Sequence, residues 1–136
     1  MPSAEPRTSS CAPESDVEAV RLAAHSYEDA LVAGDVAAAT AWFESEDDVS
    51  RFGPDGAQLG PAAVAAARAS QAPQLAPIWI LDEARSLGPD IVIHLAVLRR
   101  GDAWIQRSQV WRRGAAGWRI AHAHVAKTLE PAAVQR

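Results

Sequence analysis

Residues 104–111, WIQRSQVW, and residues 117–125, GWRIAHAHV, are the stretch of sequence that decides the fold. Both segments alternate large apolar side chains with polar ones, and a short turn that contains Gly114 and Gly117 separates them. Alternation with a period of two on both sides of a glycine-containing turn predicts a β-hairpin. Polar groups fall on faces that a small domain normally buries, which indicates that the hairpin lines a pocket.

The two faces of this hairpin follow from the alternation, because successive side chains of a strand point to opposite sides of the sheet. On the first strand we expect one face to carry Arg107, Gln109 and Trp111 and the other to carry Ser108 and Val110. On the second strand the same rule places four side chains together: Trp118, Ile120, His122 and His124.

Three helices are predicted before the hairpin. The first begins with Ser15 and Glu18, which have the spacing of a capping box, and its apolar stripe runs down to Gly34. Asp35 is expected to cap the second helix, and Pro61 suits the first turn of the third. The predicted ranges are residues 15–34, 35–43 and 61–70.

The predicted strands lie mostly after the helices. A short early strand over residues 49–52 ends at the turn sequence GPDG, and two longer strands over residues 78–87 and 91–99 precede the hairpin. Helices segregated from a run of strands predict an α+β domain with an antiparallel sheet.

Length and charge limit the classes of function. With 136 residues and a formal net charge of −4, the chain suits one domain and not non-specific nucleic-acid binding. It contains no run near the roughly 20 apolar residues of a membrane span and no signal-peptide pattern at its start, so we expect a cytoplasmic protein. Cys11 is the only cysteine, which excludes a disulfide framework.

We expect a disordered tail over residues 1–14, one domain over 15–128 and a frayed end over 129–136.

Several short pieces, in their order and spacing, resemble a known superfamily. They are YEDAL at 27–31, Gly34-Asp35, RFG at 51–53, Gly60 with Arg68, SQVW at 108–111, GWRI at 117–120 and His124-Val125. The chain resembles the nuclear-transport-factor-2-like (SnoaL-like) superfamily over residues from about 16 to 127. It is most similar to the small-amide hydrolases that include the dicarboxyurea hydrolase of cyanuric acid breakdown and relatives in oxalurate catabolism. The resemblance implies a cone: a curved antiparallel sheet wrapped around about three helices, with a pocket inside.

The resemblance also implies two catalytic residues, Tyr27 and Arg51. For the lining of the pocket it favours His124 of the two strand histidines. We expect Arg68, Arg107, Gln109 and His124 to bind substrate, with no metal and no organic cofactor. The sequence departs from the family pattern at four positions, which leaves the substrate open: Gln71, Val97, Arg107 and His122.

Each catalytic candidate has a second interpretation. Tyr27 lies on an apolar helix stripe, where a tyrosine commonly belongs to the core with its hydroxyl bound to one partner. Alternatively it transfers a proton, which requires a cation such as Arg51 to stabilise its phenolate. Arg51 either forms a surface salt bridge with the acidic residues 46–48 or holds a substrate carboxylate in its planar fork.

The histidines offer a further alternative. His122 and His124 are two residues apart on a strand, so both imidazoles face one side, and His94 would have to complete a zinc site with them. We favour a pocket role for one histidine and a structural role for the other.

Three functions remain open from the sequence. The leading hypothesis is a cofactor-independent enzyme that hydrolyses a carboxylated urea or a related small amide. The alternatives are an isomerase, dehydratase or cyclase acting on an apolar substrate, and a non-catalytic module for ligand binding or dimerisation. The five tryptophans also suit a homodimer formed through the sheet. We expect a small-molecule substrate and neither a nucleic acid nor a membrane as partner.

Overall fold

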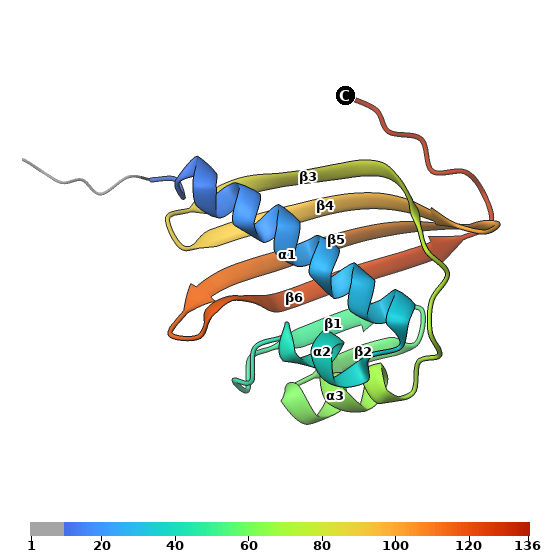
Figure 1. The fold of residues 1–136 in the computed structure, drawn as a ribbon, viewed down its shortest axis with the longest axis horizontal. Helices are drawn as coiled ribbons and strands as arrows, with labels where there is room; N and C mark the ends of the chain where they lie inside the picture. The colour runs from blue at the N-terminus through green and yellow to red at the C-terminus, as the bar shows by residue number, and fades with distance from the viewer. Residues whose placement is uncertain (1–9) are drawn as a thin grey trace, which may run out of the picture.

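Helix α1 (Glu14–Ala33) crosses one face of a six-stranded sheet in the computed structural model, which describes residues 10–136 (Figure 1). The helix buries Val20, Ala24 and Tyr27, and their steps of four and three place them on one side of it. Gly34 ends the helix with a φ of 71°, a left-handed conformation that glycine adopts without strain.

The start of α1 differs from the prediction. The N-cap is Pro13, which has no side-chain donor or acceptor to cap the helix, and Ser15 lies inside the first turn. Glu18 binds Arg21 one turn later, at 2.8 Å from Nε to Oε1. The predicted capping box is therefore wrong, because the helix begins at Glu14, two residues before the position that an N-cap at Ser15 requires.

The predicted disordered tail over residues 1–14 lies outside the described residues as far as residue 9. For its last residues the prediction is wrong. Ala12 is buried, and its backbone N–H donates to Ser86 Oγ at 2.8 Å. Residues 129–136, predicted to be frayed, form no helix or strand.

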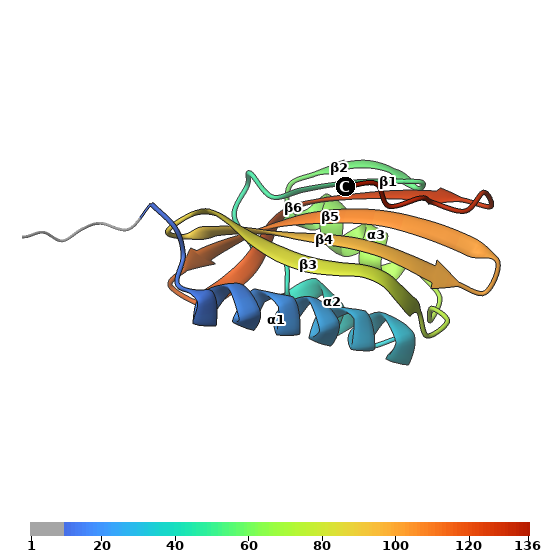
Figure 2. The ribbon, with the colours of Figure 1, turned by 90° about the horizontal axis from the view of Figure 1, so that it is seen from above.

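Two short helices, α2 (Val36–Ala41) and α3 (Pro61–Ala69), lie at one end of the sheet beside its short strands (Figures 1 and 2). Both were predicted. Asp35 caps α2 by accepting the Ala38 N–H at 3.1 Å, and Pro61 is the first residue of α3. No helix among residues 10–136 has the length and apolar character needed to cross a membrane.

The sheet has the order β2-β1-β6-β5-β4-β3 and curves over the helices (Figure 2). Its β1–β6 pair is parallel, so the expectation of a wholly antiparallel sheet is corrected at that one pair. Strand β2 was not predicted, because its four residues, GAQL, carry almost no alternation. The strands are β1 (Ser50–Gly53), β2 (Gly56–Leu59), β3 (Ile78–Gly88), β4 (Ile91–Arg100), β5 (Ala103–Gly114) and β6 (Gly117–Thr128).

A β-bulge in the hairpin of β5 and β6 changes which residues face the helices. Val110 pairs with His122, but Trp111 pairs with Ile120, so Ala121 has no partner across the ladder. An extra residue reverses the alternation of every side chain that follows it on the strand. The prediction that Ile120 shares a face with His122 and His124 is therefore wrong.

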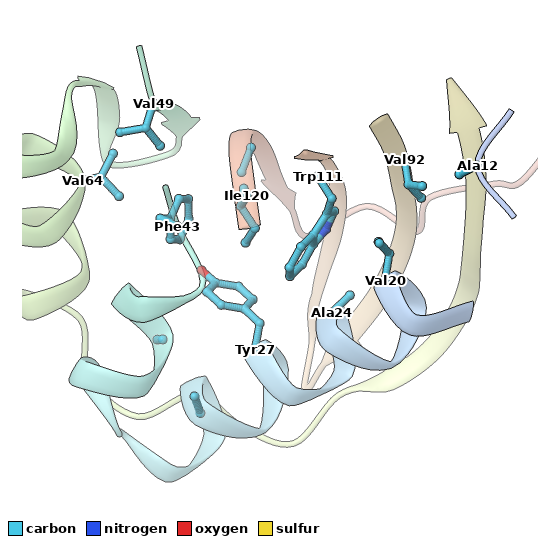
Figure 3. Close-up of a cluster of buried hydrophobic side chains, with 13 residues drawn as sticks. Ala12, Val20, Ala24, Tyr27, Phe43, Val49, Val64, Val92, Trp111 and Ile120 are labelled. Atoms are coloured by element: carbon cyan, nitrogen blue, oxygen red, sulfur yellow. The ribbon is translucent and has the colours of Figure 1, made fainter. Parts of the chain in front are cut away.

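The hydrophobic core lies between α1 and the concave face of the sheet (Figure 3). Trp111 of β5 and Ile120 of β6 are fully buried there. In Figure 3 Tyr27 projects from α1 into this cluster, with its oxygen on the side of Phe43. The core thus reaches the residue that the sequence singled out for chemistry.

Truncation of a core residue tests this packing. Ile120 is 0 % exposed, so Ile120→Ala leaves a cavity and is expected to lower the free energy of unfolding by about 2–5 kcal/mol. Ile78, at 53 % exposed, is the matched control, and Ile78→Ala is expected to change it by less than about 0.5 kcal/mol. Urea denaturation of both variants measures the difference, and equal losses would contradict the assigned core.

Candidate functional site

A cavity of about 180 Å³ opens between the second half of α1, helix α3 and the concave face of the sheet. Pockets for drug-sized ligands commonly have several hundred Å³, so this volume suits a smaller molecule. Among the described residues one carboxylate, that of Asp55, lines the cavity. Five cationic side chains line it: Arg51, Arg68, Arg100, Arg107 and Lys127. A concave site with this excess of positive charge attracts anions.

Tyr27 belongs both to the core and to this cavity. Its side chain is almost fully buried, and its ring meets Phe43 edge to face at 5.7 Å between centroids. Arg68 Nη1 donates a hydrogen bond to the Tyr27 oxygen at 2.8 Å. The cation beside the phenol is therefore Arg68 and not Arg51, which the sequence analysis had paired with it. Tyr27 thus fits the core interpretation, because it is buried with its hydroxyl bound to one partner. It also lies beside a cation, as the proton-transfer interpretation requires.

Arg68 keeps unused donors at the cavity. The residue is 3 % exposed, and within residues 10–136 its Nε and Nη2 have no hydrogen-bond partner. Burial lowers the pKa of the Arg68 guanidinium, while the neighbouring Tyr27 acts in the opposite direction. Buried N–H groups without acceptors are costly, so an anion that reached Arg68 would relieve this cost.

Arg51 projects from β1 into the same cavity and is nearly buried. Its Nη1 donates to Asp55 Oδ1 at 2.8 Å and to Gln58 Oε1 at 2.8 Å. Burial alone would raise the pKa of Asp55, but the bonds and charge of Arg51 hold it below its usual range. The alternative of a salt bridge between Arg51 and residues 46–48 is wrong, because Arg112 is the cation at that acidic loop.

Glu28 ties two of the cavity's arginines to α1. It is 2 % exposed, and its Oε1 accepts from Arg107 Nη1 at 2.9 Å and from Arg100 Nη2 at 2.9 Å. Arg107 also lies over the Tyr27 ring, 5.5 Å from its centroid. Burial would raise the pKa of Glu28, yet Arg100 and Arg107 together hold it below its ordinary value. Glu28 therefore stays ionised beneath the cavity.

Four of the six predicted site residues meet at this cavity: Tyr27, Arg51, Arg68 and Arg107. Gln109 faces the same concave side but is fully buried and bound to the Trp111 indole at 3.1 Å, outside the lining. His124 is a correction. The bulge at Ala121 turns it to the convex face, where it is exposed and lies opposite Ser108.

The same bulge separates the histidines of the zinc alternative. His94 lies on the concave face with its Nε2 at 2.8 Å from Asp82 Oδ1, whereas His122 bonds to Ser50 on the convex face. Across residues 10–136 there is no cluster of three or more histidine, cysteine, aspartate or glutamate side chains that could hold a metal ion.

Sequence reasoning missed Glu28, Arg100 and Lys127. Glu28 follows Val20 and Ala24 at steps of four, so the sequence places an acid on the buried stripe of α1. A buried acid needs partners, and this could have pointed to Glu28. Arg100 follows the buried residues of β4 at steps of two, so its inward direction could have been predicted in the same way. For Lys127 no signal existed, because its inward direction depends on the bulge.

A larger depression of about 530 Å³ lies beside α2, α3 and the turn of the β5–β6 hairpin. It contains none of the predicted site residues. Two of its charged groups are paired, since Arg112 binds Glu44 through Nε at 2.8 Å. We therefore place the candidate site in the smaller cavity.

Acid titration tests the buried cluster of Glu28. A carboxyl with a lowered folded-state pKa stabilises the protein above its ordinary pKa of 4.5, and this stability is lost as the pH falls below that value. Glu28→Gln is expected to lower the free energy of unfolding at pH 7 by about 3–5 kcal/mol, because it leaves buried arginines unpaired. The deficit is expected to shrink on acidification to about pH 3.5, measured by urea denaturation. The exposed neighbour Asp29→Asn is the control, and an equal pH dependence in both variants would contradict the assignment.

Comparison with known proteins gives the same fold. A cystatin-like fold protein from Burkholderia xenovorans has 27% identity and a TM-score of 0.78, covering 86% of this chain and 95% of its own. An NTF2-like protein from Pseudomonas putida, at 16% identity, has a TM-score of 0.68 over 85% of this chain and 88% of its own. A ketosteroid isomerase-like protein from Erwinia carotovora, at 20% identity, has a TM-score of 0.69 over 85% and 98%. No curated protein matches the chain.

A family model described as AtzH-like matches residues 12–131, which include all of α1 and the whole sheet. The α+β fold of a curved six-stranded sheet and three helices is that of the NTF2-like superfamily. By this match over most of its length, the chain belongs to the AtzH-like family, and its fold is the NTF2-like one.

Proposed function

We propose that the protein hydrolyses a small carboxylated urea or a related small amide in the cavity beside Tyr27. The observation that supports this most is the buried Arg68. It binds the Tyr27 oxygen through Nη1 and keeps two further nitrogens without partners at the cavity. A proton-transfer group and an anion-binding group thus lie in direct contact.

Substrate binding rests on the arginines. A guanidinium presents parallel N–H groups that match the two oxygens of a carboxylate. Arg68 offers Nε and Nη2 in this way. Arg107, whose Nη1 is held by Glu28, adds positive charge to the lining. Arg51 contributes positive charge from β1, where its Nη1 is engaged by Asp55. These groups favour a small molecule with carboxylate character.

Proton transfer rests on Tyr27. Its oxygen accepts the Arg68 N–H, so the phenolic hydrogen points away from that nitrogen and is available to a ligand. Donation of this hydrogen to the leaving nitrogen as the C–N bond breaks would produce a phenolate. Arg68 would stabilise that phenolate at hydrogen-bond distance.

The charge of the cavity argues against the alternative of an apolar substrate. Turnover of an apolar ring compound would leave the nearly buried guanidinium of Arg68 without a counterion. A pocket sealed by side chains, or a Tyr27 too far from Arg51 to act with it, would favour the non-catalytic alternative, whereas both residues line one open cavity.

Two substitutions test the proposal on a panel of ureido-carboxylates such as oxalurate and N-carbamoylglycine. Tyr27→Phe removes the proton and is expected to lower kcat by about 10²–10⁴-fold with little change in binding. Arg51→Met is expected to weaken binding about tenfold to a hundredfold, because it removes charge-assisted contacts. Thermal shift measures binding, and release of urea or carboxylate product measures turnover.

The matched control is Arg113→Met, since Arg113 is an exposed arginine that binds Asp16 and Asp90 away from the cavity. It is expected to leave both readouts unchanged. A wild-type protein that neither shifts in melting temperature with the panel nor turns it over would overturn the proposed function.

The homodimer through the sheet stays a prediction, and the convex face is where we propose that it forms. Leu81, Leu95 and Val97 line a shallow depression of about 300 Å³ on this face, next to His124. Leu95→Glu is expected to shift the protein from dimer to monomer in sedimentation, because it would bury a charge. Leu59→Glu, at an exposed leucine of the edge strand β2, is the control, and a monomeric wild type would contradict the prediction.

A further inference from the structure

Behind the cavity, on the same concave face, two polar side chains that the proposed mechanism leaves without a role lie near Arg107. His94 of β4 lies directly across the ladder from Gln109 of β5, and both are 0 % exposed. Side chains in such direct pairs have Cβ atoms only about 5 Å apart. Arg107 lies two residues from Gln109 and is nearly buried, so its side chain emerges on the same face.

Each of these side chains has a polar atom without a partner among the described residues. They are His94 Nδ1, Gln109 Nε2, and Nε and Nη2 of Arg107. Gln109 already uses its oxygen, which accepts the Trp111 indole N–H, and so its nitrogen points away from Trp111. Buried polar atoms are nearly always satisfied, so a cluster of four unpartnered ones indicates a bound polar species.

The tautomer of His94 follows from Asp82. His94 Nε2 lies 2.8 Å from Asp82 Oδ1, and the second oxygen of Asp82 binds Arg21 Nη1 at 2.8 Å and His25 Nε2 at 2.6 Å. A carboxylate can only accept, so Nε2 carries the hydrogen and Nδ1 keeps a lone pair. The cluster therefore offers one acceptor, His94 Nδ1, and donors from Gln109 and Arg107.

A water molecule matches this set. It donates to the one acceptor and accepts from the donors, which is the usual way in which a buried water satisfies about three polar groups. Two alanines stand directly opposite the long side chains, Ala96 across from Arg107 and Ala123 across from Gln109. Because alanine side chains are short, they leave space on this part of the concave face for the side chains of Arg107 and Gln109.

We propose that His94, Gln109 and Arg107 bind the water that attacks the substrate and that His94 Nδ1 takes its proton. The inference rests on the proposed hydrolase function. Arg107 also lines the cavity, so a water held by its remaining donors would lie beside the substrate. His94 is then a catalytic residue, and Asp82 is a positioning residue that acts through it.

The step balances as a simple hydrolysis. One O–H bond of the water breaks, its proton goes to His94 Nδ1, and the oxygen forms a bond to the carbonyl carbon. The C–N bond then breaks, and its electron pair leaves with the nitrogen, which takes the Tyr27 hydrogen. The imidazolium proton returns through solvent to the phenolate. No oxidant, metal or further reactant takes part.

The charges around His94 suit a base. Burial is the main cause that lowers the pKa of His94, and Arg107 and His25 add to it, whereas Asp82 opposes them. The imidazole is thus neutral at neutral pH and can accept a proton. The groups that face it are Asp82 and the Trp79 ring from β3, His25 and Arg21 across Asp82 from α1, and Arg107 and Gln109 from β5.

The first test needs no substrate. In ¹⁵N NMR of the full chain, which has 4 histidines, His94 is expected as the neutral tautomer with hydrogen on Nε2 at neutral pH. Cross-peaks from water to the Gln109 side-chain amide are expected as well. A protonated Nδ1, or a Gln109 amide without contact to water, would overturn the water site.

The second test uses whichever panel compound the wild type hydrolyses. His94→Gln is expected to lower kcat by about 10²–10³-fold, to leave KM within a factor of about two, and to abolish the acid limb of the pH profile. His122→Gln, on the convex face, is the matched control and is expected to keep kcat and the limb.

If His94→Gln does not fold, measurements on the wild type alone test whether His94 is the base. The pKa of the acid limb in kcat is expected to equal that of His94 measured by NMR titration, and a mismatch would overturn the base role. Turnover with an intact acid limb in His94→Gln would overturn it too, while the hydrolase function would stand. No turnover of the panel by the wild type would overturn the proposed function, and the NMR arm would still decide the water site.

Discussion

The site depends on the buried carboxylate of Glu28. It joins α1 to β4 through Arg100 and to β5 through Arg107, and it does so at the level where the helix meets the cavity. Without this charge, two arginines would be desolvated with nothing to balance them. With it, Nη1 of Arg107 is fixed while Nε and Nη2 are left for other partners. One acid thus holds the helix against the sheet and orients a cation toward the site.

Much of the fold followed from periodicity and glycine-containing turns, because all three helices and five of the six strands carry strong local patterns. The facing of residues 122–127 did not, since it depends on the bulge at Ala121, and an alanine in a strand gives no local sign of a bulge. This one residue moved His124 out of the site and Lys127 into it. Local pattern determines which segments become strands, whereas register is determined by pairing between strands.

The candidate site was predictable in its members more than in its contacts. Tyr27, Arg51 and Arg68 all reached the cavity, but the sequence joined Tyr27 to Arg51 and the structure joins it to Arg68. The cause is topological. Arg68 comes from α3, which follows the β1–β2 hairpin and returns toward α1, and sequence spacing does not encode that approach. The packing of helices and strands determines which side chains become partners. The sequence can therefore indicate which polar residues belong to a site, but not which of them contact each other.

The β1–β2 turn places Asp55 only four residues after Arg51, and the two are bound across it at 2.8 Å. Asp55 is itself a carboxylate at the cavity wall, so it occupies Arg51 in the way an acidic ligand would. Any incoming carboxylate meets an internal competitor at an effective concentration set by a very short chain segment. Affinity at Arg51 is therefore a difference between two similar interactions. In the proposed hydrolysis, this internal competition would ease the release of an anionic product after each turnover.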